Sequence, residues 1–328
     1  MSDRPHERTP SDPSLNLPMA DPLVGSHPLV RRAAALVPRL AVGPPYPILI
    51  EAETGCGAEL VAHAIHRQSL RAARRFAMVA CAPLGEDLLA ELFGGPHGAP
   101  GLVETTAGGT LFIDQPAEAS PAAQPRLARL AAGFWRPGVR EGGAGERRAE
   151  LRLIAATAVD LAAAVGSGAM RADLHLALRA SVVALPPLRE RRDELPGMID
   201  ELLPRLARRH ERAVPAIDGA ARTMLLDHDW PGNLRELSQT LDRALVAANG
   251  TITVADLALG TTLAPARLPA GQAGEGLVIP PGMRDLATIE GIVVRAVLAE
   301  TGNQKTRAAA MLGINRTTLY NKLRALGL

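Results

Sequence analysis

Residues 46–59 read YPILIEAETGCGAE, and this stretch holds the pattern that decides the fold. The apolar run Tyr46–Ile50 predicts a buried strand, and helical spacing of apolar residues over Glu59–Ser69 predicts a helix. Between them lies a short turn that contains two glycines. A strand, a glycine-containing turn and a helix in this order are typical of a phosphate-binding loop, whose backbone N–H groups surround phosphate oxygens.

The turn departs at two positions from the usual phosphate-binding pattern, G-x-x-x-x-G-K. Gly55 and Gly57 keep the conformational freedom that a tight turn requires, but Ala52 occupies the position of the first glycine of the pattern. Ala58 stands at the lysine, whose ammonium group would reach the outer phosphates. No neighbouring lysine can replace it, because the first 304 residues contain none.

Further apolar runs predict that this strand belongs to a larger sheet. They alternate with helical patterns, which is typical of a parallel sheet covered by helices on both faces. From Glu194 to Leu259 the pattern is wholly helical. The fold class is therefore α/β, with a P-loop type of parallel sheet followed by a helical lid. The predicted strands are Tyr46–Ile50, Phe76–Ala80, Thr110–Ile113, Leu151–Ala155 and Val182–Leu185.

The composition favours a cytoplasmic protein of two or three compact units. The chain has 328 residues, 47% of them hydrophobic, and no apolar run is long enough to cross a membrane. The polar, proline-rich N-terminus does not resemble a signal peptide. Two cysteines, Cys56 and Cys81, are too few for a disulfide framework, so we expect a reducing compartment and no membrane partner.

Changes in composition divide the chain into five parts. A proline- and glycine-rich stretch, TTLAPARLPAGQAGEGLVIPPG, follows the helical lid and is typical of a linker. We predict a disordered N-terminus over 1–20, an α/β domain over 21–193, a lid over 194–260, a linker over 261–282 and an all-α domain over 283–328.

The all-α part carries the pattern of a helix-turn-helix. The final 26 residues contain five basic side chains and no acidic one, a charge that can displace counterions from DNA phosphates. Apolar spacing predicts a helix over 304–312, a turn at Gly313 and a third helix capped by Asn315. Leu319 and Leu323 face inward, so polar and basic side chains cover the outer face, which would enter a major groove.

A preceding helix, Asp285–Glu300, offers an apolar face for dimerisation, which would let two recognition helices meet successive major grooves. Arginine and asparagine can read base edges, whereas threonine and lysine suit phosphates. The predicted DNA-contacting residues are Lys305, Thr306, Arg307, Asn315, Arg316, Thr317, Thr318, Tyr320, Asn321, Lys322 and Arg324.

The run GNQKTRAAAMLGINRTTLYNKLRALGL, residues 302–328, resembles the C-terminal domain of the nucleoid protein Fis, which the nitrogen-regulation activators share. The resemblance implies a Fis-type helix-turn-helix that binds double-stranded DNA. The expected assembly is a homodimer or a higher oligomer.

Residues 21–259 resemble the AAA+ domain of sigma-54-dependent activators, because several motifs of that family occur in the family's order. The resemblance implies an AAA+ P-loop fold with a helical lid. The matching segments are ELFG (91–94) at the start of the sigma-contacting loop, GGTLFID (108–114) at the Walker B strand, LRLIAAT (151–157) at the first sensor strand, LPPLRER (185–191) before the lid and WPGNLREL (230–237) at the second sensor helix.

The resemblance also assigns roles at single positions, some kept and some replaced. The kept nucleotide-binding positions are Gly55, Gly57, the magnesium-binding Asp114, the arginine finger Arg171 and the second-sensor Arg235. The replaced positions are Ala58 for the lysine, Gln115 for the water-activating glutamate, Ala158 for the first-sensor asparagine and Ala177 for a second arginine finger. The family's GAFTGA sequence, which engages the sigma factor, is missing, as after a deletion.

Our leading prediction is a sequence-specific DNA-binding transcription regulator that is not an enzyme and has lost sigma-54 contact. Glutamine cannot accept a proton as a general base, and the loss of a catalytic arginine would compound that defect. No cofactor would be required, although the kept positions leave room for weak ATP binding. The alternatives are an ATP-dependent sigma-54 activator and an interaction subunit that modulates intact AAA+ relatives. RNA polymerase and such a relative are the further candidate partners.

A few remaining residues have simpler interpretations. His63 and His66 are spaced as metal ligands on a helix, but no third ligand is near, so we interpret them as ordinary helix surface and predict no metal site. Cys56 lies at a helix N-terminus, where a reactive thiol is the alternative to a simple small-residue replacement. The pair Asp193–Glu194 is interpreted as solvated, and Trp230 as lid core.

Overall fold

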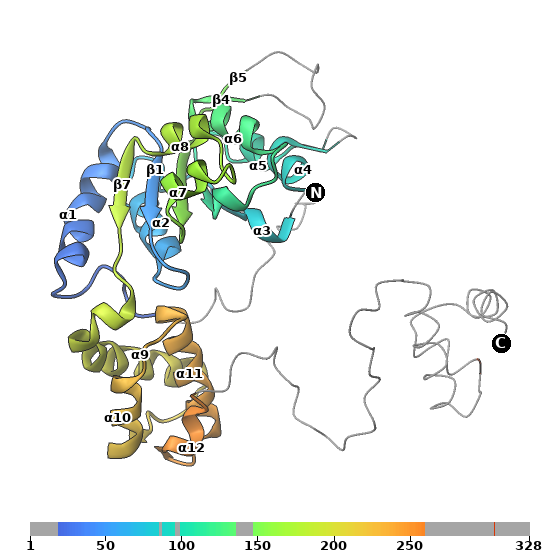
Figure 1. The fold of residues 1–328 in the computed structure, drawn as a ribbon. Coiled ribbons are helices and arrows are strands. Elements are labelled where there is room, and N and C mark those ends of the chain that lie inside the picture. Colours follow the sequence, from blue (N-terminus) through green and yellow to red (C-terminus); the bar gives the residue numbers. More distant parts are fainter. Residues whose placement is uncertain (1–18, 85–86, 96–98, 136–146, 260–304, 306–328) are drawn as a thin grey trace. The chain divides into compact units, whose positions relative to one another are not determined.

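The computed structural model describes residues 19–84, 87–95, 99–135, 147–259 and Lys305. The chain forms two units, residues 1–260 and 261–328, and the elements described below belong to the first (Figure 1). Among the described residues no helix is both long and apolar enough to span a bilayer.

The core of this unit is a five-stranded parallel sheet, as the alternation of strands and helices predicted. The strands lie in the order β2-β3-β6-β1-β7, and each neighbouring pair is parallel. Non-consecutive neighbours require crossovers, which the helices on the two faces provide. The strands are β1 (Ile48–Glu51), β2 (Phe76–Ala80), β3 (Thr110–Asp114), β6 (Arg152–Thr157) and β7 (Ser181–Ala184).

The strand β2 has the predicted bounds, and the bounds of the other four strands differ by one or two residues from the predicted ones. β1 begins at Ile48 and not at Tyr46. Pro47 has no N–H to give to a ladder, so pairing starts after it. β3 and β6 run on to Asp114 and Thr157, which carries these two strands one or two residues further toward the functional edge of the sheet.

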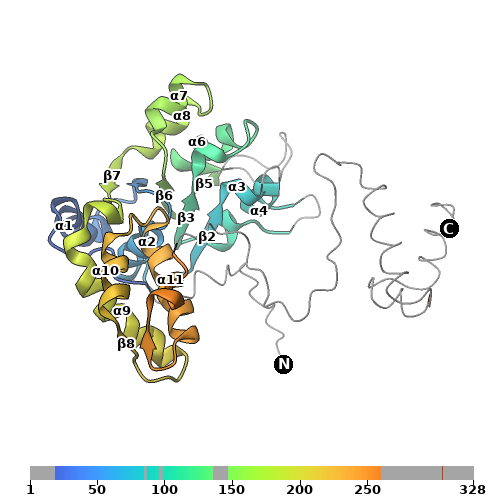
Figure 2. The ribbon, with the colours of Figure 1, turned by 60° about the horizontal axis from the view of Figure 1, so that its bottom comes forward.

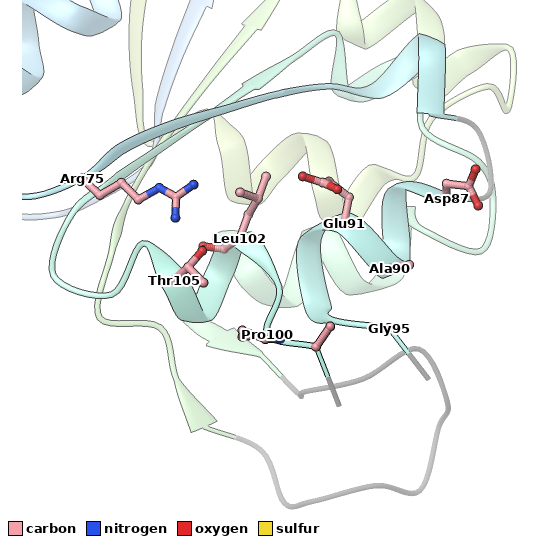
Figure 3. A pocket seen from close by; sticks show the side chains of 9 residues that line it. Arg75, Asp87, Ala90, Glu91, Gly95, Pro100, Leu102 and Thr105 are labelled. Atoms are coloured by element: carbon pink, nitrogen blue, oxygen red, sulfur yellow. The ribbon is translucent and has the colours of Figure 1, made fainter. Parts of the chain in front are cut away.

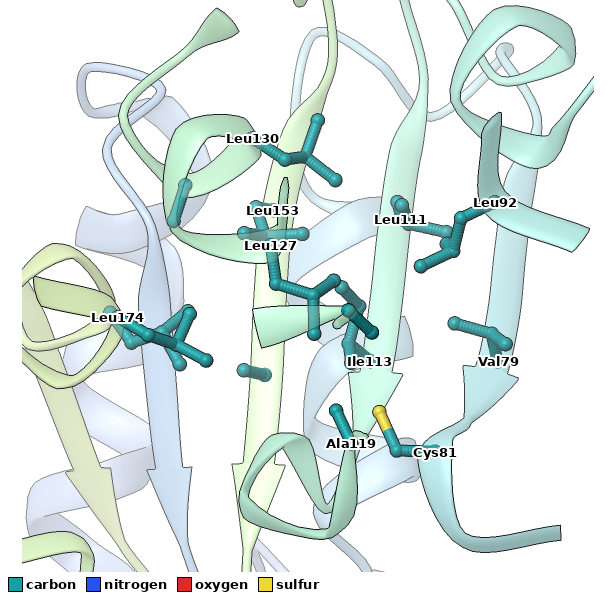
Figure 4. Packing of buried hydrophobic residues seen from close by; sticks show 14 of the residues in the cluster. Val79, Cys81, Leu92, Leu111, Ile113, Ala119, Leu127, Leu130, Leu153 and Leu174 are labelled. Carbon is teal, nitrogen blue, oxygen red and sulfur yellow. The ribbon is translucent and has the colours of Figure 1, made fainter. Parts of the chain in front are cut away.

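Alternating side chains of the strands enter two separate cores. Ile48 and Ile50 pack on one face against α1 (Pro28–Val42) and α2 (Ala58–Arg67), whereas Leu49 points to the other face. Figure 4 shows that second core, where leucines of helices on the far face meet Val79, Ile113 and Leu153. The helices on this side are α3 (Cys81–Leu84), α4 (Leu88–Phe93), α5 (Leu102–Thr105), α6 (Gln124–Ala131), α7 (Leu161–Gly166) and α8 (Ala172–Leu178).

The lid is a bundle of helices with its own core around Trp230, as predicted for that residue. The Trp230 indole N–H donates to the Leu225 carbonyl at 3.0 Å, so the only polar group of this buried ring is satisfied. Figure 1 shows the lid helices below the strands of the large sheet, and Figure 2 shows the lid turned toward the viewer. The helices are α9 (Leu195–Arg209), α10 (Gly219–Asp227), α11 (Asn233–Ala247) and α12 (Val254–Leu257).

The prediction that the lid is wholly helical is wrong, because two short strands pair in parallel beside the bundle. These are β8 (Ala216–Ile217) and β9 (Thr251–Ile252). Each is only two residues long, so neither is long enough to produce an alternating pattern in the sequence. A second small pair, β4 (Phe134–Trp135) and β5 (Arg147–Arg148), is antiparallel.

The segment just before α1 lies against the lid, which corrects two predictions. Met19 and Ala20 pack into the lid core and are not part of a disordered N-terminus, whereas residues 1–18 lie outside the described residues. Glu194 is not a solvated charge, since its side chain is only 8% exposed. Its carboxylate accepts the N–H groups of Ser26 and His27 at 2.6 and 2.7 Å and is paired with Arg191.

Candidate nucleotide and DNA sites

The turn after β1 is fixed against the lid by its two glycines. Gly55 and Gly57 have φ of +82° and +93°, a left-handed conformation that favours glycine. A Cβ on Gly55 would lie 2.2 Å from the carbonyl oxygen of Gly232 in the lid. The Arg235 N–H also donates to the Gly55 carbonyl at 3.3 Å. The turn therefore keeps phosphate-loop geometry and is closed on one side by lid backbone.

Ala58 begins α2 with a methyl group where a phosphate loop has its lysine, so the cations near the turn come from elsewhere. Arg235 of α11 is one of them, and its Nε is buried without a hydrogen-bond partner in the described part of the chain. Burial raises the pKa of Asp114 and the charge of Arg235 opposes that rise, which indicates that the guanidinium lies near that carboxylate. A buried, unpartnered N–H is costly, and an anionic ligand would satisfy it.

Arg189 is the second cation, and it binds the turn itself. Both of its terminal nitrogens donate to the Glu53 carboxylate, at 2.8 and 2.6 Å, and Asn233 Nδ2 approaches the same group at 3.4 Å. The hydrogen bonds from Arg189 lower the pKa of Glu53 more than burial raises it. A bidentate pair of this kind fixes orientation as well as charge.

Asn233 connects three segments that are far apart in the sequence. Its side-chain oxygen accepts the Leu188 N–H at 2.7 Å, and its amide nitrogen donates to the Thr54 carbonyl at 3.0 Å. The residue is fully buried and has a left-handed φ of +51° at the start of α11. The network of Glu53, Arg189 and Asn233 was missed by sequence reasoning, because partners up to 180 residues apart leave no local pattern.

Asp114 and Gln115 end β3 at the same edge of the sheet. Burial raises the pKa of Asp114, and the nearby Glu118 raises it further, against the opposing charge of Arg235. Gln115 has a φ of +54°, and its backbone N–H donates to the Ala156 carbonyl at 2.9 Å. Its side-chain oxygen accepts the Ala158 N–H at 3.1 Å, which holds the amide over the end of β6.

Arg171 lies at the N-cap of α8, apart from the turn. Within the described residues its guanidinium binds Asp173 at 2.8 to 3.3 Å, and its backbone N–H donates to the side chain of Gln124 at 2.8 Å. The side chain is half-exposed, and Ala177 on the same helix packs partly against the core. Of the five predicted nucleotide residues, the structure thus brings Gly55, Asp114 and Arg235 together with Gly57, while Arg171 faces solvent.

The predicted DNA site lies outside the described residues, apart from Lys305, which is half-buried in a helix. The other ten DNA-contacting residues, the linker and the dimerisation helix remain predictions.

The two histidines and the cysteine are not reactive groups. His66 is 4% exposed and not helix surface, and its Nδ1 lies 2.9 Å from the Thr110 hydroxyl. His63 stacks on Phe76 with ring centroids 3.9 Å apart. Burial raises the pKa of the Cys56 thiol to about 12, so this sulfur stays protonated and is a packing residue.

Comparison with known proteins assigns each part of the chain. Residues 23–184 match the sigma-54 interaction domain, residues 189–267 the AAA+ ATPase lid domain, and residues 285–326 the Fis family of bacterial regulatory proteins. The transcriptional regulatory protein ZraR of Klebsiella oxytoca is 36% identical in an alignment that covers 97% of this chain and 72% of that protein.

The chain belongs to the sigma-54-dependent transcriptional regulators. ZraR of Escherichia coli (strain K12) is 38% identical over 84% of this chain, and the regulatory protein AtoC of that organism is 37% identical over 86%. This family member spans 62% of the length of each of those two relatives. The comparisons confirm the AAA+ fold with its lid and the Fis-type helix-turn-helix.

The prediction that this family member is not an enzyme is contradicted by the comparisons. NtrX from Brucella abortus, solved in complex with ADP and with ATP, has a TM-score of 0.65 and 28% identity over 93% of this chain. The relatives and the fold therefore indicate an ATPase, and the sigma-54 match favours the ATP-dependent alternative over loss of sigma-54 contact.

The physical error lay in treating each replaced residue as an absolute requirement. A glutamine cannot act as a general base, but in small GTPases and Gα proteins a glutamine orients the attacking water. The Gln115 side chain is fixed at the end of β3, because its oxygen accepts the Ala158 N–H. Likewise, the positive charge that Ala58 does not supply can come from an arginine, and Arg235 lies beside the turn and near Asp114.

Proposed function

We propose that this chain is an ATP-dependent transcription regulator that binds ATP between the turn after β1 and the lid. The observation that carries the proposal is the convergence of Gly55, Asp114 and Arg235 at the carboxyl edge of the sheet. Ligands of open parallel sheets bind at this edge. Such a regulator would work in the cytoplasm, where it meets both ATP and promoter DNA.

Each group at this edge has a part in binding or turning over ATP. The N–H groups of the turn and of the first turn of α2 surround phosphate oxygens, as the left-handed Gly55 and Gly57 allow. The Arg235 Nε–H, which has no hydrogen-bond partner among the described residues, would donate to a phosphate oxygen. Asp114 would hold the magnesium ion that accompanies ATP. Gln115 orients the attacking water.

Arg171 would act on a neighbouring copy of the chain. Its guanidinium faces solvent, and among the described residues its partner is the exposed carboxylate of Asp173. An exposed pair of this kind costs little to break. We therefore propose a homo-oligomer in which Arg171 reaches the phosphates bound by the next subunit, as an arginine finger in trans.

The DNA-contacting part of the proposal rests on the Fis-type family match over residues 285–326. Arg316, Asn321 and Arg324 would read or approach bases, and the other predicted residues would bind phosphates. Occupancy of genomic DNA should show discrete sites that Arg316→Ala removes. Unchanged occupancy would contradict the assigned recognition helix.

The nucleotide proposal is tested with the full chain by fluorescent ATP binding and by phosphate release. Arg235→Ala should weaken ATP binding by about tenfold or more, the range expected for a lost charge-assisted hydrogen bond. Arg243→Ala is the matched control, since Arg243 is exposed on the same helix. Asp114→Ala should abolish phosphate release. Release that survives Asp114→Ala, or no binding of ATP by the unaltered chain, would overturn the proposal.

A second candidate function is favoured by the short connection between α4 and α5, which lacks the GAFTGA sequence. The chain would then assemble with a relative that carries a full sigma-contacting loop. Mixing the purified chain with such a relative distinguishes the two candidates. A mixed oligomer whose turnover differs from that of either protein alone supports the second candidate, whereas separate oligomers exclude it.

A further inference from the structure

The amino ends of the parallel strands, opposite the candidate nucleotide site, carry a surface rich in arginine. The segment RQSLRAARR, residues 67–75, joins α2 to β2 and contains four arginines and no acidic residue. Two more arginines, Arg147 and Arg148, form β5 just before β6 begins. We name the six residues Arg67, Arg71, Arg74, Arg75, Arg147 and Arg148 the arginine edge.

Backbone contacts fix the arginine segment in place. Arg71 Nη1 donates to the Gly108 carbonyl at 2.9 Å and approaches the Glu150 carbonyl at 3.4 Å, in the turns that precede β3 and β6. The Arg75 carbonyl accepts the Thr110 N–H at 3.0 Å. The Arg74 side chain lies 3.8 Å from where a Cβ on Gly108 would be. The arginines of this segment are therefore held at the edge by the sheet itself.

A buried cation adds to the positive charge of this edge. Arg152, at the start of β6, is 3% exposed, and within the described residues its hydrogen bonds go to the carbonyls of Ala41 and Pro44, at 3.2 and 3.5 Å. Burial lowers its pKa, and the charge of Arg71 lowers it further, yet an arginine stays protonated at neutral pH. Because carbonyl groups carry no net charge, they leave the charge of Arg152 uncompensated.

Within the described ranges, acidic side chains lie near three of the six arginines of the arginine edge. Arg147 lies 3.8 Å from Glu104. Arg75 extends into a pocket of about 470 Å³ that Glu91 and Asp87 also line (Figure 3). Glu150 is exposed near Arg71. In the described part of the chain, the exposed side chains of Arg67, Arg74 and Arg148 have no carboxylate within ion-pair distance.

We propose that the arginine edge is a second DNA-contacting surface, which binds phosphates of the duplex that the Fis-type domain holds. Guanidinium groups suit phosphate oxygens, and contacts to phosphates need no particular base sequence. DNA bound by one part of a chain is presented to the rest of it at a high effective concentration, so a weak surface is enough. This inference does not depend on ATP binding.

A protein partner is the less favoured occupant of this surface. Leu70 in the arginine segment is 97% exposed, but single exposed apolar residues are ordinary on protein surfaces. A protein interface would need an apolar centre with few charges, whereas four of the nine residues of this segment are arginine.

The test measures how DNA affinity of the full chain depends on salt, with labelled random-sequence duplexes of roughly 20 and 60 base pairs, about two and six helical turns. The double variant Arg67→Gln/Arg74→Gln removes two charges from the arginine edge. The control variant Arg31→Gln/Arg32→Gln removes two exposed charges near the start of α1. This end of α1 follows His27, whose N–H binds Glu194 next to the lid. Circular dichroism of each variant checks that the fold is intact.

On the long duplex, the edge variant should reduce the slope of log affinity against log salt by about two, close to one for each lost phosphate contact. The α1 variant should leave the slope unchanged. On the short duplex, which the Fis-type domain occupies, the edge variant should have the same salt slope as the unaltered chain. Equal salt slopes for the edge variant and the α1 variant on the long duplex would overturn the proposal. An edge variant whose slope falls equally on the short and the long duplex would overturn it too. An unchanged salt slope would leave a protein partner as the occupant.

Discussion

At the scale of single residues, Gly55 is the position at which both the fold and the candidate site require a residue without a side chain. The residue needs a left-handed backbone and also lies too close to Gly232 for any side chain. Gly133 has a similar φ of +89°, but a Cβ there would meet nothing within 4 Å. A comparison of substitutions at the two glycines therefore separates the cost of backbone strain from the cost of steric contact.

Replacing each glycine by alanine should show the two costs. Gly133→Ala should lower the free energy of unfolding by about 1–2 kcal/mol, the usual penalty for a left-handed alanine. Gly55→Ala should cost roughly 1–3 kcal/mol more, because the methyl group must push the lid away from the turn. Denaturant unfolding measures both. Equal losses would mean that the turn and the lid are not in contact in solution.

His66 gives the stability a pH dependence. Burial lowers its pKa, so the folded protein favours the neutral ring, and the lowered pKa of His63 acts in the same direction. A group with a lowered folded pKa contributes stability that is present above its unfolded pKa, near 6.5, and is lost as the pH falls toward the folded pKa.

We therefore expect the Tm to fall between about pH 7 and pH 5, and His66→Gln to fall less over that range. Glutamine can still bind the Thr110 hydroxyl but does not titrate. Thermal unfolding followed by circular dichroism at each pH makes the comparison. Parallel curves for the two proteins would assign the pH dependence to other groups.

At this scale the resemblance to a family assigned roles to residues, whereas their contacts came only from the structure. The resemblance assigned Gly55, Asp114 and Arg235 to one nucleotide site, and the structure places Asp114 at the end of β3 and Arg235 on α11, beside the turn. Sequence reasoning could not see that Gln115 is held by Ala158 or that Arg235 has an unpartnered nitrogen, since both facts depend on contacts across the fold. Counting replaced residues thus led to the wrong conclusion about ATPase activity.

At the scale of elements, local pattern and long-range contact make different contributions. The strands of the large sheet follow from apolar runs, because buried parallel strands are apolar on both faces. The short pair β8 and β9 and the attachment of residues 19–26 to the lid leave no such pattern. The latter depends on Arg191, which is 2% exposed and binds the carbonyls of Pro22 and Val24 as well as Glu194.

Replacing Arg191 should consequently lower the free energy of unfolding far more than replacing a surface arginine of the same lid. Arg191→Leu leaves Glu194 buried without its cation, so we expect a loss of about 3–5 kcal/mol in the free energy of unfolding. Arg222 pairs with Asp200 on the surface, with both side chains more than a third exposed, and Arg222→Gln should cost less than about 1 kcal/mol. Chemical denaturation of the two variants decides. Similar losses would show that the buried pair does not hold this segment.

At the scale of the whole molecule, the chain divides into residues 1–260 and 261–328. The three hydrophobic cores of the described part, one on each face of the sheet and one in the lid, all belong to the first unit. The DNA-contacting residues predicted from sequence belong to the second. Composition alone predicted a boundary in this region, because a run of proline and glycine cannot build a core.

A chain that ends at Gly260 should therefore keep the main unfolding transition of the full protein. Its denaturation midpoint should match that transition, while its affinity for DNA should fall by at least about tenfold, since only non-specific phosphate contacts remain. Circular dichroism and DNA titration measure the two effects. A fragment that fails to fold would show that the second unit stabilises the first.

The connection between α4 and α5 has one more consequence. A Cβ on Gly101 would lie 2.4 Å from the Gly94 nitrogen and 2.3 Å from the Leu92 carbonyl, so the two helix ends already touch at its base. Where the ends of a segment meet, lengthening it adds only a small closure entropy, about 0.6 kcal/mol for each doubling. This point of the domain can gain or lose a hairpin without repacking anything beneath it. A domain built this way can change the length of a surface connection while its sheet stays the same.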